Sequence, residues 1–197
     1  MSLFRLTRAP ETEPLIRGDG LYLRPAISAD FPAWAQLRAE SRAFLTPWEP
    51  TWPEDDLTRA AFRRRLRRQS DDMTRDESFT FFIFDAATDA LLGGLTIGGI
   101  RRGVAQAATL GYWMGAKYAG RGRMTRAVAA ATRYGFSTLR LHRIEAACLP
   151  ENVASMTLLE RNGFQREGLA RAFLKIDGAW RDHVLYALLE HEAPRGV

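Results

Sequence analysis

Two glycines stand among arginines directly before an apolar helical repeat, in the stretch YAGRGRMTRAV of residues 118–128. Glycine costs a helix interior about 1 kcal/mol relative to alanine, so Gly120 and Gly122 favour an open loop that ends where a helix begins. The first amides of a helix have no partner within it, and the helix dipole makes this end partly positive. Glycines let a ligand come close to such amides. The stretch therefore predicts a strand–loop–helix unit with a phosphate or pyrophosphate at the start of the helix.

Two familiar phosphate loops do not fit these residues. A Walker loop requires Gly-Lys-Ser/Thr at its end, and here Arg123 follows Gly122. A Rossmann fingerprint requires a third glycine where this chain has Thr125. On spacing alone, a purely structural turn remains an open alternative.

The hydrophobic pattern changes period several times along the chain. Helices are expected at 31–40, 57–69, 124–139 and 151–164, the first capped by Ser28 or Asp30 and the last ended by Asn162-Gly163. Strands are expected at 20–27, 78–85, 91–100, 107–115, 142–149, 169–176 and 180–189. The last two flank Asp177-Gly178, a strong hairpin signal.

This order predicts one mixed α/β domain over residues 1–197, with the unit at 107–149 forming a parallel crossover and the front half antiparallel. Residues 1–20 are polar and irregular, and residues 1–14 are expected to be a surface leader. The segment 44–56 carries three prolines and two tryptophans, which predicts an aromatic loop.

Composition excludes several classes of protein. The chain of 197 residues carries a net charge of +5, a mild basic balance that does not require nucleic acid as partner. Cys148 is the single cysteine, and no apolar run approaches the ~20 residues of a membrane helix. We therefore expect a cytoplasmic protein without a membrane partner. Six arginines within 59–69 predict a solvated helix face or, as the alternative, a basic stripe toward ribosomal RNA or an acidic partner.

The pattern Lys117-x-x-Gly120-x-Gly122 after a GYWM strand resembles the acetyl-CoA loop of the GNAT N-acetyltransferases, although that family usually has Gln or Arg in place of Lys117. The segment NVASMTLLERNGF (152–164) resembles the family's next helix. FLTPWEP (44–50) and IDGAWRDHVLYALL (176–189) resemble the RimJ/RimL-like, ribosomal-protein alanine N-acetyltransferase group. The likeness covers about residues 15–190.

The resemblance implies a GNAT fold, in which one parallel strand pair of a mostly antiparallel sheet is splayed at the cofactor site and helices cover both faces. It also implies acetyl-CoA as cofactor and coenzyme A as product. Residues implied to bind the cofactor are Trp113, Met114, Gly120, Arg121, Gly122, Arg123, Met124, Thr125, Asn152 and Ser155. No His/Cys cluster has metal-ligand spacing, so no metal is predicted.

Acetyl transfer needs a neutral amine. An α-amine has a pKa of ≈ 7.7–8.0 and lysine ≈ 10.4, so about 3.4 kcal/mol less has to be overcome at a chain terminus. Glu49 is the candidate base, with an ordinary exposed glutamate as the alternative. Glu145 is a second candidate, with pairing to a neighbouring arginine as its alternative.

The leaving thiolate needs a hydrogen-bond donor. Many relatives have a tyrosine where this chain has Leu159, and the resemblance implies Ser155 in that role. Cys148 is interpreted as a buried structural thiol rather than a nucleophile. Residues expected to bind the acceptor are Trp48, Glu49, Tyr112, Asp182 and His183.

Together these features predict an acetyl-CoA-dependent N-acetyltransferase in which the amine attacks the thioester directly. The preferred acceptor is the N-terminus of a protein, specifically a ribosomal protein. A small amine such as an antibiotic, polyamine or amino acid is the alternative acceptor. A ribosome- or RNA-associated module with a vestigial site is the alternative outside catalysis, and the protein is expected to be a monomer or homodimer.

Overall fold

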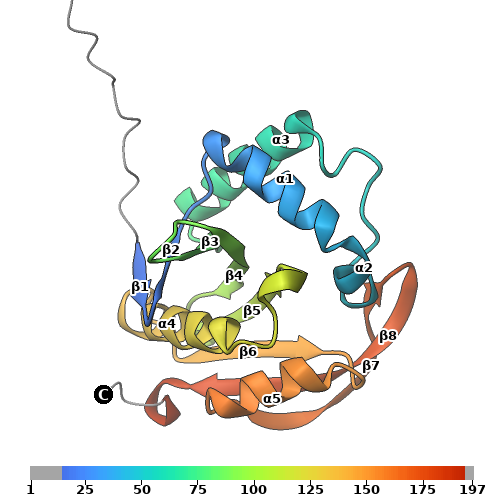
Figure 1. Ribbon diagram of the computed structural model, residues 1–197. Helices are drawn as coiled ribbons and strands as arrows, with labels where there is room; N and C mark the ends of the chain where they lie inside the picture. Colours follow the sequence, from blue (N-terminus) through green and yellow to red (C-terminus); the bar gives the residue numbers. More distant parts are fainter. Residues whose placement is uncertain (1–14, 194–197) are drawn as a thin grey trace, which may run out of the picture.

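An eight-stranded sheet forms the centre of the computed structural model, which describes residues 15–193 (Figure 1). In spatial order the strands are β1-β2-β3-β4-β5-β6-β8-β7, and all neighbours are antiparallel except β5 and β6. The strand bounds are β1 Ile16–Gly18, β2 Leu21–Arg24, β3 Ser78–Asp85, β4 Leu91–Arg101, β5 Ala107–Met114, β6 Arg143–Cys148, β7 Gln165–Ile176 and β8 Ala179–Leu189. The mixed α/β class and the single parallel pair predicted from the sequence are confirmed.

Helices cover both faces of this sheet (Figure 1). They are α1 Phe31–Glu40, α2 Arg42–Leu45, α3 Arg59–Thr74, α4 Arg123–Ser137 and α5 Val153–Arg161, with 3-10 turns at η1 Ser28–Asp30, η2 Thr46–Trp48, η3 Ala116–Tyr118 and η4 Glu190–Glu192. Because side chains alternate along a strand, β3 supplies two separate cores. Phe81 and Ile83 pack with α4 and α5, whereas Phe82 and Phe84 pack with Trp34 of α1 and Phe62 of α3.

The parallel strands β5 and β6 pair over a short distance only. Their register runs from Ala107↔Arg143 to Thr109↔Glu145. Beyond these residues β5 continues to Met114 while β6 continues to Cys148, and the two no longer pair. The sheet is therefore splayed here, as the family resemblance implies, because β6 leaves β5 to follow β8.

Several local predictions are confirmed. The Asp177-Gly178 turn joins β7 to β8, with φ of 44° and 80°. Gly163, with φ of 84°, directly follows α5 and its C-cap Asn162. The tip of the β7–β8 hairpin reaches the α2 region (Figure 1), where the Asp177 amide donates to the carbonyl of Glu49 over 3.0 Å. This hydrogen bond joins the hairpin to the aromatic loop.

Other local predictions are wrong. Residues 16–18, expected to be irregular, form β1, because Ile16 is buried and pairs with Leu23. The aromatic loop begins with α2 and η2, and α3 extends to Thr74. β7 begins at Gln165, four residues earlier than expected. The prediction missed its start because these first residues are exposed and polar and lack the apolar alternation typical of a strand. The predicted leader 1–14 lies outside the described residues.

The cap predicted for α1 is right in its position at Asp30 but lacks the expected hydrogen bond. Asp30 occupies the N-cap position, but neither it nor Ser28 makes a side-chain cap hydrogen bond. The Asp30 carboxylate instead binds the Arg24 guanidinium through two hydrogen bonds of 2.8 and 2.7 Å and accepts one from the Ile27 amide. A buried arginine outcompetes the helix amides for this carboxylate, since the pair is hydrogen-bonded at both ends.

Candidate active site

The glycine loop opens α4 with unpaired amides. Gly122 is the N-cap, with φ of 69°, a left-handed conformation that favours glycine. The Arg126 amide donates to the Gly122 carbonyl at 3.1 Å, so the amides of Arg123, Met124 and Thr125 have no partner within the helix. These three residues line the largest cavity described below. An anion bound here would meet main-chain donors and the positive end of the helix dipole.

The arginine side chains in and after this loop differ in whether they form ion pairs with carboxylates of the protein. Arg123 forms an ion pair with Asp85 at 3.2 Å and lies over the Tyr118 ring. Arg126 contacts Asp19 at 3.3 Å. Arg121 is exposed and has no ion pair within residues 15–193, so its charge is available to a ligand. The loop therefore offers mainly backbone donors, supplemented by the guanidinium of Arg121.

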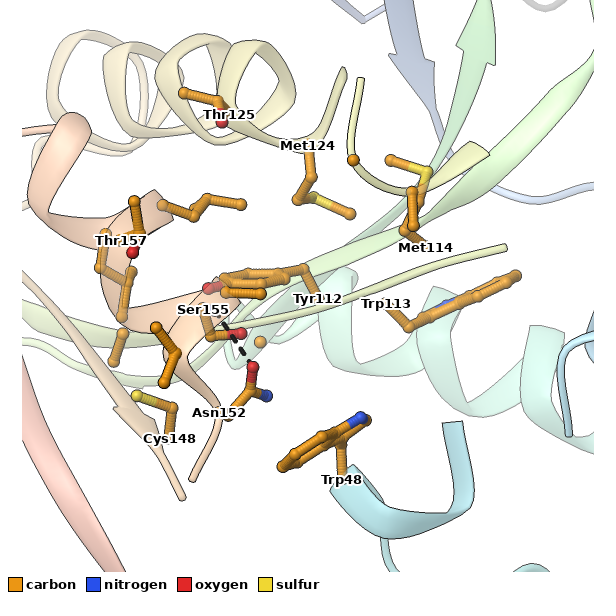
Figure 2. A pocket seen from close by; sticks show the side chains of 18 of the residues that line it. Trp48, Tyr112, Trp113, Met114, Met124, Thr125, Cys148, Asn152, Ser155 and Thr157 are labelled. Carbon is orange, nitrogen blue, oxygen red and sulfur yellow. Dashed lines mark hydrogen bonds between the residues drawn. The ribbon is translucent and has the colours of Figure 1, made fainter. Parts of the chain in front are cut away.

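A cavity of about 770 Å³ fills the splay between β5 and β6 and extends to the start of α4. We call it the β5–β6 cavity. Figure 2 shows its lining, with Met124 and Thr125 on α4, Tyr112 to Met114 on β5, and Asn152 and Ser155 at the start of α5. Predicted site residues that line it are Trp48, Glu49, Tyr112, Trp113, Met114, Gly120, Arg121, Gly122, Arg123, Met124, Thr125, Asn152, Ser155 and His183.

The backbone of β5 presents free groups to this cavity. The Gly115 amide donates to Leu92 of β4 at 2.9 Å, and main-chain groups alternate in direction along a strand. Trp113 therefore faces β4, while the amides and carbonyls of Tyr112 and Met114 face the side from which β6 has departed. An extended ligand could pair with these groups as an added strand.

Polar side chains gather at the start of α5. The Asn152 Oδ1 accepts a hydrogen bond from the Ser155 amide at 3.1 Å, which caps the helix (Figure 2). The Ser155 side chain lies near the Tyr112 ring. Burial raises the pKa of Tyr112 to about 12, and the neighbouring Ser155 hydroxyl acts in the opposite direction. Tyr112 therefore keeps its phenolic proton at neutral pH.

Glu49 is held in a clamp of aromatic and basic side chains. Both of its carboxylate oxygens accept hydrogen bonds from the Arg38 guanidinium, each at 2.7 Å, and Oε2 also accepts from the Trp52 indole at 2.7 Å. The guanidinium lies between the Trp52 and Trp113 rings, 4.0 and 4.9 Å from their centroids. Arg38 is buried, so the clamp fixes Glu49 in one orientation beside β5.

The clamp brings together residues that the sequence reasoning missed, Arg38 and Trp52. Arg38 occupies the apolar face of α1, four residues after the buried Trp34 and next to the buried Leu37. An arginine on the apolar face of a helix requires a buried partner. Its position on that face is therefore the sequence signal that could have identified Arg38. No local pattern connects it with Glu49 specifically.

Two predicted residues, Glu145 and Asp182, occupy surroundings that differ from the expectation. Glu145 does not line the cavity; it pairs with Arg101 at 2.6 Å and Arg143 at 2.9 Å, which hold its pKa below the usual range against the effect of burial. Asp182 is exposed, and its carboxylate accepts from the Ala172 amide at a bulge in β7. Cys148, by contrast, is buried as expected; it also lines the cavity, and burial raises its pKa to about 11.

His183 does reach the cavity wall. It is buried, its Nδ1 lies 3.0 Å from the Arg181 carbonyl, and its ring meets Phe173 edge to face. Within residues 15–193, no group of three or more His, Cys, Asp or Glu side chains is arranged to hold a metal ion. None of the helices over this range has the length and apolar character needed to cross a membrane.

Comparison with known proteins agrees with this geometry. Residues 20–165 match the family model of the acetyltransferase (GNAT) domain, so the chain belongs to the GNAT family of acetyltransferases. It is 40% identical over 161 residues to the [ribosomal protein uS5]-alanine N-acetyltransferase of Escherichia coli, covering 81% of this chain and 83% of the relative. It is 37% identical over 175 residues to the probable N-acetyltransferase YjcK of Bacillus subtilis, covering 89% and 97%.

A solved structure, Mycobacterium smegmatis RimJ in complex with CoA-disulfide, superposes with a TM-score of 0.85 at 32% identity, covering 92% of this chain and 88% of that one. The protein is thus an acyltransferase of the RimJ-like group, and its cofactor is acetyl-CoA. The open amides at α4 and the long cavity in the splay fit a diphosphate followed by an extended arm.

Proposed function

We propose that this enzyme acetylates the N-terminal α-amine of a protein, with a ribosomal protein as the specific acceptor. The E. coli relative supports this proposal, since its name states an alanine of ribosomal protein uS5 as acceptor. Such an acceptor requires the enzyme where ribosomes are assembled, in line with the cytoplasmic location predicted from the sequence.

The observation that carries the proposal is a pair of cavities that share a wall. The β5–β6 cavity lies toward α4 and α5, and a second cavity of about 530 Å³ lies toward α1 and α3. Both are lined by Glu49, Gly111, Tyr112 and Trp113. An acceptor chain can therefore reach β5 from one face of the sheet while the cofactor occupies the other.

Glu49 is proposed to bind and deprotonate the acceptor amine. A carboxylate has about four acceptor positions, and Arg38 and Trp52 occupy three of them. We assign the remaining position to the amine. An α-amine with a pKa near 8 needs only a weak base at neutral pH, so a carboxylate held by a guanidinium is sufficient.

Acetyl-CoA supplies an acetyl group activated as a thioester. The Met114 amide is proposed to donate to the carbonyl oxygen as negative charge develops on it, a contribution of a few kcal/mol when the donor is preorganised. Ser155 Oγ is proposed to donate to the sulfur, and the Tyr112 phenol holds a proton beside it. Arg121 and the α4 amides bind the diphosphate.

The test is release of free thiol from acetyl-CoA across a panel of acceptors, with mass spectrometry to locate the acetyl group. The panel contains peptides beginning with Ala or Ser, the same peptides blocked by N-formylation, and small amines such as spermidine. We expect a single acetyl group on the α-amine of the free peptides. Turnover confined to the small amines would contradict a protein acceptor, and salt-sensitive RNA binding without thiol release would contradict catalysis.

A further inference from the structure

The second cavity, which we call the α3 cavity, lies between α3, the aromatic loop and the face of β3, β4 and β5. The side chains that line it from α3 and the loop include Trp52, Asp56, Arg65, Arg68 and Gln69. Its floor is part of the sheet itself, because Thr80, Thr96 and Gly111 are cross-strand partners in one row. Residues paired across strands place their side chains on the same face.

The floor is hollow at Gly111, whereas the space left by the glycine of the neighbouring row is filled by an aromatic ring. In the neighbouring row, Gly94 stands opposite Trp113, and a Cβ on Gly94 would lie 2.5 Å from the Trp113 indole nitrogen. The absence of that Cβ lets the indole ring lie across β4. A Cβ on Gly111 would meet no atom within 4 Å, so this position leaves unfilled space. Thr80 and Thr96 beside it bond to each other at 3.1 Å.

Gly111, Thr80 and Thr96 form a small, polar depression in the α3 cavity, which Glu49 also lines. A large apolar side chain would bury the two hydroxyls against carbon, whereas a small side chain leaves room for water around them. The depression and Glu49, the residue proposed to hold the acceptor amine, are parts of the same cavity. It is therefore suited to the first side chain of the acceptor.

The charges around the α3 cavity are mostly neutralised in pairs. Arg38 binds Glu49, and Arg65 binds Asp56 at 2.7 Å. Arg68 is the one cation of the lining without a carboxylate partner within residues 15–193, and it lies exposed at the rim. The unbalanced charge of this cavity is thus a single positive charge on its α3 side.

We propose that the α3 cavity binds the leading residues of the acceptor, its floor selecting a small first side chain and Arg68 selecting an acidic residue a few positions further along the chain. The inference rests on the proposed acetylation of a protein N-terminus and names the class of terminus that is preferred. The selected acceptors are acidic peptides that begin with Ala, Ser or Gly.

The first test compares Arg68→Glu with Arg67→Glu. Both residues are exposed on α3 and the substitutions change net charge equally, but Arg67 does not line the cavity. With a peptide that begins with Ala and carries Glu at positions 3 and 4, Arg68→Glu should raise KM about tenfold, with kcat and the KM of acetyl-CoA unchanged. Arg67→Glu should change the same KM by less than about twofold. A peptide with Lys in place of Glu at positions 3 and 4 should have a lower KM than the Glu peptide with the Arg68→Glu variant, the reverse of the wild-type preference.

The second test compares Gly111→Val with Gly168→Val. Both glycines lie in strands with open space where a Cβ would stand, so both variants should fold, and Gly168 lines neither cavity. Gly111→Val should raise the KM of the Ala peptide about tenfold or more, while Gly168→Val should leave it unchanged. The coenzyme A affinity of both variants should stay at the wild-type value, because a side chain at position 111 would lie with Thr80 and Thr96 on the α3 face of the sheet, although the Gly111 backbone also lines the β5–β6 cavity. Thermal unfolding checks that the two are equally stable.

The outcomes separate the two levels of the proposal. Peptide acetylation with the same constants in wild type, Arg68→Glu and Gly111→Val would overturn the inference and leave the proposed function in place. If Gly111→Val lost affinity for coenzyme A by the same factor as for the Ala peptide, Gly111 would belong to the cofactor site, and this result would also overturn the inference. Acetylation of small amines alone by the wild-type enzyme would overturn both.

Discussion

The two cavities that meet at β5 are built in different ways. The β5–β6 cavity offers main-chain groups to a ligand, namely the amides that open α4 and the free edge of β5. The α3 cavity is built from side chains that come from α1, the aromatic loop, α3 and three strands. One side of the enzyme therefore depends on backbone conformation, which few substitutions disturb, and the other depends on contacts between residues far apart in sequence.

Side chains can be exchanged around the α3 cavity without altering the α4 amides, since no residue of α4 lines it. Conversely, the amides lose their function only if the glycine conformation is lost or the space in front of them is filled. Four substitutions test this division, ordered by the size of the expected effect.

Gly122→Glu should lower the affinity for coenzyme A by about 1,000-fold or more, ~4 kcal/mol. The backbone of the new residue would have to keep a left-handed conformation, and its side chain would place a negative charge at the amides that we propose bind the diphosphate. Calorimetric titration with coenzyme A measures this loss.

Gly103→Glu is the matched control for that substitution. Gly103 also has a left-handed conformation, with φ of 65° and open space around a Cβ, but it lines neither cavity. It should show the same conformational strain with unchanged coenzyme A affinity. Equal losses in the two variants would mean that strain alone, not the anion site, explains the effect.

Arg38→Met should lower kcat/KM for the acceptor about 100-fold, because Glu49 loses the clamp that orients it beside β5. The coenzyme A affinity should stay within about twofold of wild type, since Arg38 does not line the β5–β6 cavity. Stability should fall by about 3 kcal/mol, the usual cost of leaving one charge of a buried pair without its partner. Steady-state kinetics and denaturant unfolding measure the two effects.

Arg24→Met separates lost stability from lost orientation. Arg24 forms a similar buried bidentate pair with Asp30 and stacks on Phe84 at 4.1 Å, yet it lines neither cavity. The two variants should lose similar stability, and only Arg38→Met should lose activity per folded molecule. A parallel loss of activity in Arg24→Met would make the clamp a structural feature without a positioning role.

The difference between local backbone features and contacts of distant side chains also determines which parts of the structure could be predicted from the sequence. The loop at Gly120 and Gly122, the Asp177-Gly178 turn and the alternation of β3 are local patterns, and each predicted its structure correctly. The Arg38–Glu49 clamp joins residues eleven positions apart across a loop, and the floor of the α3 cavity joins three strands. The floor follows from strand register, and the clamp follows from the way α1 and the aromatic loop pack together; no single segment specifies either. The ion pair between Glu145 and Arg101, 44 positions away, is hidden from the sequence for the same reason.

Ser155→Ala should lower kcat about tenfold, the effect of losing one hydrogen bond to a developing charge. The cap of α5 depends on the Ser155 amide and Asn152 Oδ1, which the substitution leaves in place, so stability should change little. Tyr112→Phe is the companion variant. Because the pKa of Tyr112 is raised to about 12, wild-type activity should show no tyrosine titration below about pH 10. A loss confined to Tyr112→Phe would transfer the donor role from Ser155 to the phenol.

Cys148→Ala should change kcat by less than about threefold, although Cys148 lines the β5–β6 cavity, because direct attack by the amine needs no acyl-enzyme. Burial raises the pKa of this thiol to about 11, so the folded protein retains its proton where an unfolded chain, with a value of 9.0, releases it. Wild type should therefore be alkylated slowly by iodoacetamide at about pH 8 and faster as the pH rises toward 11. Its stability relative to Cys148→Ala should decrease over the interval from pH 9.0 to about 11, since the unfolded chain then binds fewer protons. Fast alkylation near neutral pH, together with loss of turnover in Cys148→Ala, would indicate a covalent acyl-enzyme instead of direct attack. The β5–β6 cavity would then depend on an essential side chain as well as on its main-chain groups.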